Sequence, residues 1–233
     1  MKTSLISRAT AEAVGTGFLV IAVIGSGIAA QRLSPDDVGL QLLENSLATG
    51  ATLVVLILAL QPVSAAFNPV ITAVERFTGA IDPRESAASV AAQIIGGILG
   101  AITANLMFGE PAISIAGTDR GGVGRLLGEV VATAGLVLII TALSRNGRIH
   151  LTAYAVGGYI TAAYWFTSST SFANPAVTVA RMFSDTFAGI AASSVPLFLA
   201  AQAVGAAAGY GLASVFYPQP SLRPRVQETV SET

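Results

Sequence analysis

The sequence predicts an all-α membrane protein with six transmembrane helices plus two re-entrant half-helices, arranged as an inverted repeat. Three observations lead to this fold class. Of the 233 residues, 53% are hydrophobic and 11% are charged, whereas a soluble domain carries about 25% charged residues. Six apolar runs approach the length of about 20 residues that a helix needs to cross a bilayer. Two Asn-Pro pairs, each followed by a short apolar segment, occupy similar places in the two halves of the chain.

The six apolar runs cover residues 9–30, 42–63, 87–108, 125–143, 149–166 and 195–216. The first follows Lys2 and Arg8 but is longer than a signal-peptide core, so we expect it to remain as a span. In a six-span arrangement most Lys and Arg residues fall on the side of the termini, which predicts that both termini are cytoplasmic. Residues 218–233 are polar and contain three prolines, and they are predicted to form a mobile C-terminal tail.

The two half-helices are predicted from Asn68-Pro69-Val70 and Asn174-Pro175-Ala176. Asn favours the N-cap position of a helix, and Pro favours the first helical position after it. The apolar segments that follow, 70–78 and 177–187, are too short to cross a bilayer. Each Asn-Pro pair therefore indicates the abrupt start of a helix that enters the membrane without spanning it.

The repeat is visible in the spacing of polar residues within the apolar runs. Glu12 and Glu129 lie 117 residues apart, each early in a span, and Gln93 and Gln202 lie 109 apart. The Asn-Pro pairs are 106 apart, and the order of all three features is kept. Repeat one covers about 8–108 and repeat two about 125–217. Because each half has three spans, the second enters the membrane from the opposite face, and such inverted repeats build their sites at the midplane from discontinuous helices.

Two half-helices that enter from opposite faces should meet N-terminus to N-terminus near the middle of the bilayer. Each N-terminus behaves as roughly half a positive charge, so the meeting point should repel cations, including hydronium. If Asn68 and Asn174 cap their own helices through oxygen, each NH₂ group faces a lumen as a donor. This arrangement is typical of a passage for uncharged solutes that excludes protons.

Several classes of function are disfavoured by the composition. The chain has no Cys and one His, so thiolate and His-based metal sites are excluded, and no metal or other cofactor is expected. It also lacks a basic patch for nucleic acid, and no candidate nucleophile has a plausible base partner for an enzyme. For Glu12 and Glu129 the alternatives are a structural brace and a proton relay, because intramembrane carboxylates are functional candidates by default. Gln93 and Gln202 are interpreted as hydrogen-bond partners of neighbouring helices or loops.

This constellation, in this order, resembles the aquaporin (major intrinsic protein) family over roughly residues 12–217. The resemblance implies six helices and two half-helices in a single channel domain, residues 1–217, with one pore per subunit of a homotetramer in the lipid bilayer. It also implies that Glu12 and Glu129 hold the re-entrant loops by accepting backbone hydrogen bonds.

Two departures from the family pattern bear on selectivity. Val70 stands where the first motif usually has Ala, and Val177 stands where an Arg of the narrow outer filter usually follows the second motif. Counting from the Asn-Pro pairs places the filter at Thr49, Ala162, Ser171 and Val177. None of the four is aromatic or charged, which predicts a wider and less polar constriction.

Aromatic and basic residues near the predicted filter receive separate interpretations. Tyr159, Tyr164, Trp165 and Phe166 are predicted to belong to an aromatic belt at the membrane surface. The sequence leaves open whether Arg181, one turn beyond Val177, contributes to the outer mouth.

The filter pattern resembles the aquaglyceroporin branch associated with bacterial arsenic resistance. That resemblance implies a passive channel of the bacterial inner membrane for small neutral solutes: water, glycerol and arsenite as As(OH)₃. Two alternatives remain at this point, a mainly water-conducting aquaporin and a proton-coupled secondary transporter that uses Glu12 and Glu129.

Overall fold

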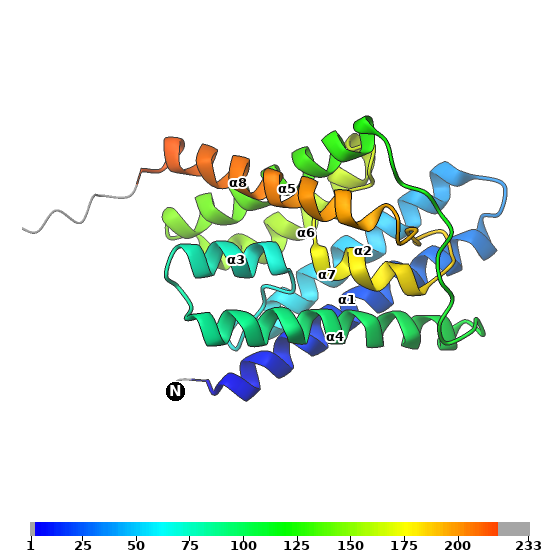
Figure 1. Cartoon of the computed structure of the whole chain (residues 1–233), viewed down its shortest axis with the longest axis horizontal. Helices are drawn as coiled ribbons and strands as arrows, with labels where there is room; N and C mark the ends of the chain where they lie inside the picture. Colours follow the sequence, from blue (N-terminus) through cyan, green and yellow to red (C-terminus); the bar gives the residue numbers. More distant parts are fainter. Residues whose placement is uncertain (1–2, 219–233) are drawn as a thin grey trace, which may run out of the picture.

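The structure is a computed structural model that describes residues 3–218, and these residues form helices and loops without a β-strand (Figure 1). The all-α fold class is therefore confirmed. Most of the predicted C-terminal tail, from residue 219 onward, lies outside the described residues. The elements in chain order are α1 (Leu5–Leu33), α2 (Val38–Leu60), α3 (Pro69–Phe77), α4 (Pro83–Met107), α5 (Val123–Arg145), η1 (Ile149–Leu151), α6 (Thr152–Phe166), α7 (Pro175–Ala180), η2 (Arg181–Phe183) and α8 (Val195–Phe216).

Five helices of the described chain are long and apolar enough to cross a membrane: α1, α2, α4, α5 and α8. The sixth predicted span, residues 149–166, forms the 3₁₀ turn η1 followed by the 15 residues of α6. At 1.5 Å per residue α6 is about 22 Å long, shorter than the hydrocarbon core of about 30 Å. The run was correctly bounded, but its α-helical part is shorter than a full span.

The two half-helices, α3 and α7, begin near the middle of the molecule and run toward opposite ends (Figure 1). Asn68 and Asn174 are their N-caps, and Pro69 and Pro175 are their first residues. The second half-helix is shorter than the predicted 177–187, because the chain turns extended at Ser184 after η2.

Glycines bring the long helices together in the same way in both halves. A Cβ on Gly100 of α4 would overlap the carbonyl of Gly17 on α1, and one on Gly209 of α8 would overlap that of Ala134 on α5. Without a hydrophobic driving force between helices in lipid, such small residues permit the close backbone approach that holds a bundle together. The α1–α4 contact of the first half is thus reproduced by α5–α8 in the second.

The loop between α4 and α5 crosses the end of the molecule remote from both described termini, at the right of Figure 1. Its backbone pairs with the segment after α7: Ala116 N–H donates to Met182 O over 2.9 Å, and Ala191 N–H donates to Thr118 O over 2.8 Å. The loop thereby covers the C-terminal end of the second half-helix.

Candidate pore

The two Asn residues interlock the half-helices at the centre of the molecule. Asn68 Oδ1 accepts a hydrogen bond from the second residue of its own helix over 3.0 Å, and its Nδ2 donates to Ala173 O over 2.8 Å. Asn174 makes the equivalent pair of bonds: its Oδ1 accepts from the second residue of its own helix over 3.0 Å, and its Nδ2 donates to Phe67 O over 2.7 Å. An amide NH₂ has two hydrogens. One therefore links the two loops, and only the other is left for a solute.

The residue before each Asn has a left-handed backbone conformation, with φ of 47° at both Phe67 and Ala173. For residues other than glycine, such a conformation costs about 1–3 kcal/mol and persists only where its surroundings impose it. Here a buried carboxylate does so in each half. Glu12 accepts from Phe67 N–H over 2.7 Å and from the preceding N–H over 2.9 Å. Glu129 accepts from Ala173 N–H over 2.9 Å and from the preceding N–H over 2.8 Å.

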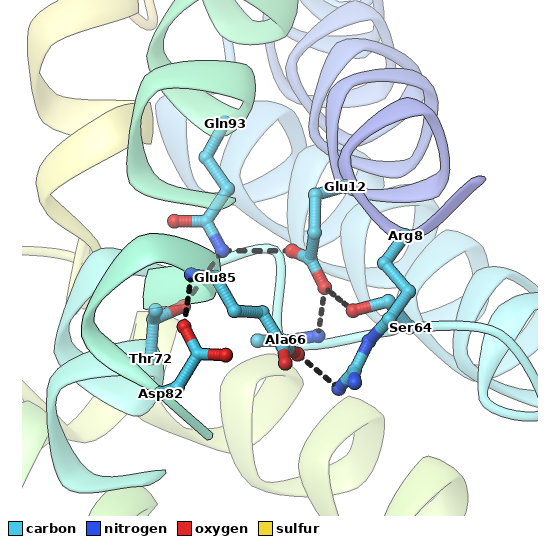
Figure 2. A network of polar contacts seen from close by, with 8 residues as sticks. All are labelled: Arg8, Glu12, Ser64, Ala66, Thr72, Asp82, Glu85 and Gln93. Carbon is cyan, nitrogen blue, oxygen red and sulfur yellow. Dashed lines mark hydrogen bonds and ion pairs between the residues drawn. The ribbon is translucent and has the colours of Figure 1, made fainter. Parts of the chain in front are cut away.

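Each carboxylate is tied in turn to a glutamine of the last span in its half. Gln93 Nε2 donates to Glu12 Oε2 over 2.7 Å and to Thr72 Oγ1 over 2.9 Å, so α1, α3 and α4 are joined by one amide (Figure 2). Ser64 Oγ adds a further hydrogen bond to Glu12. The network also lies near an ion pair between Arg8 of α1 and Glu85 of α4 (Figure 2).

The second half reproduces this network. Gln202 Nε2 donates to Glu129 Oε2 over 2.7 Å and to Thr178 Oγ1 over 2.9 Å. Both carboxylates are fully buried, and neither lines the central cavity formed by the described residues.

A cavity of about 550 Å³ passes both Asn residues and extends from Arg8 and Arg145, near the termini, to Arg181 at the opposite end. Two helices line it with every fourth residue: α2 from Thr49 to its C-cap Gln61, and α6 from Thr152 to Tyr164. Residues four apart share one helical face, so each helix presents a single stripe to the lumen.

Three of the four predicted filter residues, Thr49, Ser171 and Val177, line this cavity. Ala162 does not: its side chain is exposed on the outside of α6, and the prediction for this position is wrong. The physical reason is helical rotation, because Ala162 lies two residues from Ile160 and Tyr164, on the opposite side of the helix.

Tyr164 was missed as a lining residue. It is 3% exposed and lines the cavity, and its hydroxyl is hydrogen-bonded to Thr49 Oγ1 over 3.2 Å. Its placement in an aromatic belt is therefore wrong, and an aromatic side chain stands beside the predicted filter residue Thr49, whereas Trp165 and Phe166 are exposed. The repeated spacing of four from Thr152 was the signal that could have found it.

The third residues of the two motifs, Val70 and Ala176, are buried but do not line the cavity. The Val in place of Ala in the first motif is thus a packing difference. No group of three or more His, Asp or Glu side chains within residues 3–218 could hold a metal ion.

Two arginines surround one ring at the end of the cavity remote from the termini. The Arg181 guanidinium lies 3.5 Å from the centroid of Phe172, and its Nε donates to Ala188 O. The Arg120 guanidinium lies 5.0 Å from the same centroid and donates to Gly189 O over 2.7 Å. Burial lowers the pKa of Arg120 to about 10, so it stays charged at neutral pH. Of the two, only Arg181 lines the cavity.

Comparison with known proteins agrees with this geometry. The family described as Major intrinsic protein matches residues 1–162. Aquaglyceroporin AqpS of Rhizobium meliloti (strain 1021) is 46% identical over 230 residues, which cover 98% of this chain and 97% of that protein. The X-ray structure of the aquaglyceroporin from Plasmodium falciparum shares the fold, with a TM-score of 0.67 and 19% identity over 92% of this chain and 96% of that one. The chain therefore belongs to the major intrinsic protein family, whose members are membrane channels.

Proposed function

We propose that this chain is a passive aquaglyceroporin with a wide filter, which passes water, glycerol and arsenite as As(OH)₃. The observation that carries the proposal is the cavity that passes the two interlocked Asn residues, with Val177 in its wall. Val177 stands where the family usually has an Arg, and a valine leaves more room and removes a fixed charge. The relative from Rhizobium meliloti, which is named an aquaglyceroporin, supports water and glycerol as solutes.

A mainly water-conducting channel is the first alternative, and Tyr164 is the observation that favours it. Its hydroxyl is hydrogen-bonded to Thr49 in the cavity wall, and its ring takes up room that a filter of small residues would leave open. The width of the constriction then depends on Tyr164 and Val177 together. We propose that it still admits glycerol, because the other lining residues at this level, Thr49 and Ser171, have short side chains.

A proton-coupled transporter receives little support from the two buried glutamates. Glu12 and Glu129 accept hydrogen bonds from loop amides and glutamines, and they stand outside the cavity wall of the described chain. A carboxylate in such a place braces a loop and has no direct path to a solute in the lumen.

The test is permeability of the purified protein in vesicles. Stopped-flow measurements of vesicle volume under water and glycerol gradients, with arsenite uptake measured alongside, should show all three above protein-free vesicles. Water flux without glycerol or arsenite flux would support the water channel instead. Solute uptake that follows an imposed proton gradient would support the transporter and contradict a passive channel.

The remaining parts of the proposal concern assembly and placement. We propose a homotetramer in the bacterial inner membrane, with both termini cytoplasmic and residues 1–217 forming one channel domain of two repeats. Native mass spectrometry measures the subunit number. Protease cleavage of a terminal tag in sealed right-side-out and inside-out vesicles measures the orientation, and cleavage from outside the cell would contradict it.

A further inference from the structure

The Arg181 guanidinium is a buried charge at the outer part of the cavity, on the end remote from the termini. The side chain is 3% exposed, lines the lumen and has no carboxylate partner within residues 3–218, where the ion pairs are Arg8–Glu85 and Arg32–Glu110. Its Nε donates to Ala188 O. Buried charges in proteins are ordinarily paired, because an isolated charge loses the stabilisation that water gives.

A second arginine, Arg120, adds positive charge beside Arg181. Arg120 packs on the same Phe172 ring and donates to two backbone carbonyls, those of Gly189 and Phe187. Glu129, the buried carboxylate of this half, accepts from two loop amides and a glutamine and keeps its negative charge, which opposes one of the two positive charges. Two guanidinium groups and one carboxylate leave one positive charge in excess among these three residues, and only Arg181 presents its charge to the lumen.

A second polar group at this end also lacks a partner. Ser171 Oγ is buried and makes no hydrogen bond to any described residue, although Ser171 is 3% exposed and lines the cavity. Its backbone is held in the left-handed region, with φ of 50°. Thr49 and Tyr164 line the same cavity, and their hydroxyls are hydrogen-bonded to each other. One guanidinium and three hydroxyls therefore line the outer half of the cavity.

We propose that this set of groups is a binding site for the anion of a small hydroxycarboxylic acid, which the channel carries as a second class of solute. Guanidinium groups pair with carboxylates in a charge-assisted, often bidentate geometry. Hydroxyl groups next to the carboxylate would bond to Ser171, Thr49 and Tyr164. The inference rests on the proposed function, because it requires the cavity to conduct.

The centre of the cavity is compatible with an anion. The N-termini of α3 and α7 meet there, and a helix N-terminus carries a partial positive charge that attracts anions. The same dipoles that repel hydronium would stabilise a carboxylate after it leaves Arg181. An anion would therefore meet favourable charge from the outer mouth to the midplane.

The probe is glycerate, because it differs from glycerol by carrying a carboxylate at one end. Uptake of radiolabelled glycerate and glycerol is measured in vesicles that contain the protein, with potassium and valinomycin present to dissipate the membrane potential. We expect glycerate uptake above that of protein-free vesicles. In Arg181→Gln the ratio of glycerate to glycerol uptake should fall about tenfold, the loss expected when a hydrogen-bonded charge is removed.

Arg120→Gln is the matched control, because Arg120 supports the same loop and ring without reaching the lumen. Its glycerate-to-glycerol ratio should fall far less than that of Arg181→Gln, because the charge of Arg120 stays outside the lumen. Equal loss of both solutes in both variants would show that Arg181 only holds the loop, and would overturn the inference. Should Arg181→Gln not fold, Ser171→Ala decides: a lower ratio supports the site, and an unchanged ratio overturns it.

The two proposals fail separately in this experiment. Glycerol uptake without glycerate uptake in the wild type would overturn the anion site and leave the aquaglyceroporin proposal intact. Absence of uptake of either solute would overturn the proposed function itself, and the anion site with it.

Discussion

Replacing Glu129 by Gln should destabilise the second re-entrant loop. The carboxylate accepts from Phe172 N–H on Oε1 and from Ala173 N–H and Gln202 Nε2 on Oε2. A glutamine keeps one acceptor oxygen, and its best orientation turns NH₂ toward Phe172 N–H. That leaves one buried amide without an acceptor, at a cost of about 1–3 kcal/mol.

The other two hydrogen bonds also weaken, because they lose the assistance of the charge, at a cost of about 1 kcal/mol each. A neutral amide is less costly to bury than a carboxylate, which offsets part of the loss. We therefore expect a net destabilisation of about 2–3 kcal/mol by Glu129→Gln, or a fall of about 5–10 °C in unfolding temperature.

Glu12→Gln should cost less, although the two residues hold equivalent positions. The Ser64 hydroxyl donates to Glu12 Oε1 and can rotate to accept from the new NH₂ group. Ala66 N–H loses its acceptor, as Phe172 N–H does in Glu129→Gln, but here the new NH₂ group has a hydrogen-bond partner.

Thermal unfolding in detergent, with Glu110→Gln as control, measures these differences. Glu110 pairs with Arg32 at the surface, and such pairs contribute at most about 1 kcal/mol. If the two buried variants unfold at the wild-type temperature and change only the proton dependence of uptake, the glutamates act as a proton relay and our reasoning is wrong.

Three further predictions concern the filter and the packing of the bundle. Val177→Arg should reduce glycerol flux at least about tenfold more than water flux in stopped-flow assays, because it narrows the lumen and adds a charge; equal reduction of both would place Val177 outside the constriction. Tyr164→Ala should raise glycerol flux, whereas Ala162→Leu should leave it unchanged because that side chain lies outside the cavity. A glycerol flux that is unchanged in Tyr164→Ala and reduced in Ala162→Leu would place Ala162 in the cavity wall and contradict the structure. Gly209→Ala should destabilise the protein by about 1–3 kcal/mol because its Cβ would overlap the backbone of α5. Gly211→Ala, with nothing within 4 Å of its Cβ, should be neutral or stabilising by up to about 1 kcal/mol in thermal unfolding, and similar losses in both variants would contradict the packing argument.

The half-helix starts could be predicted from local chemistry. Asn and Pro at consecutive positions favour a helix N-terminus whatever the surrounding fold, and both pairs form one. The polar residues Glu, Asn and Gln occur in the same order in both halves of the chain, which predicted that the two halves make equivalent contacts. The hydrogen bonds of Gln93 and Gln202 are equivalent in the structure.

The rotation of α6 could not be predicted by counting from the motifs. In a soluble protein, the contrast between apolar and polar faces shows which side of a helix is buried. In lipid that contrast disappears, because Ala162 on the outside and Ile160 in the lumen are both apolar. Each residue turns a helix by about 100°, so an error of two residues placed Ala162 in the wall and left out Tyr164.

By itself the sequence determined the all-α class, the six apolar runs and the two helices that begin inside the membrane. These depend on hydrophobicity and capping, which act over a few neighbouring residues. Only the tertiary structure decided which face of α6 lines the lumen, how the amides of Asn68 and Asn174 cross to the opposite loop, and where Arg181 stands. Those features depend on contacts between segments about a hundred residues apart, whose geometry is set by the packing of the whole bundle.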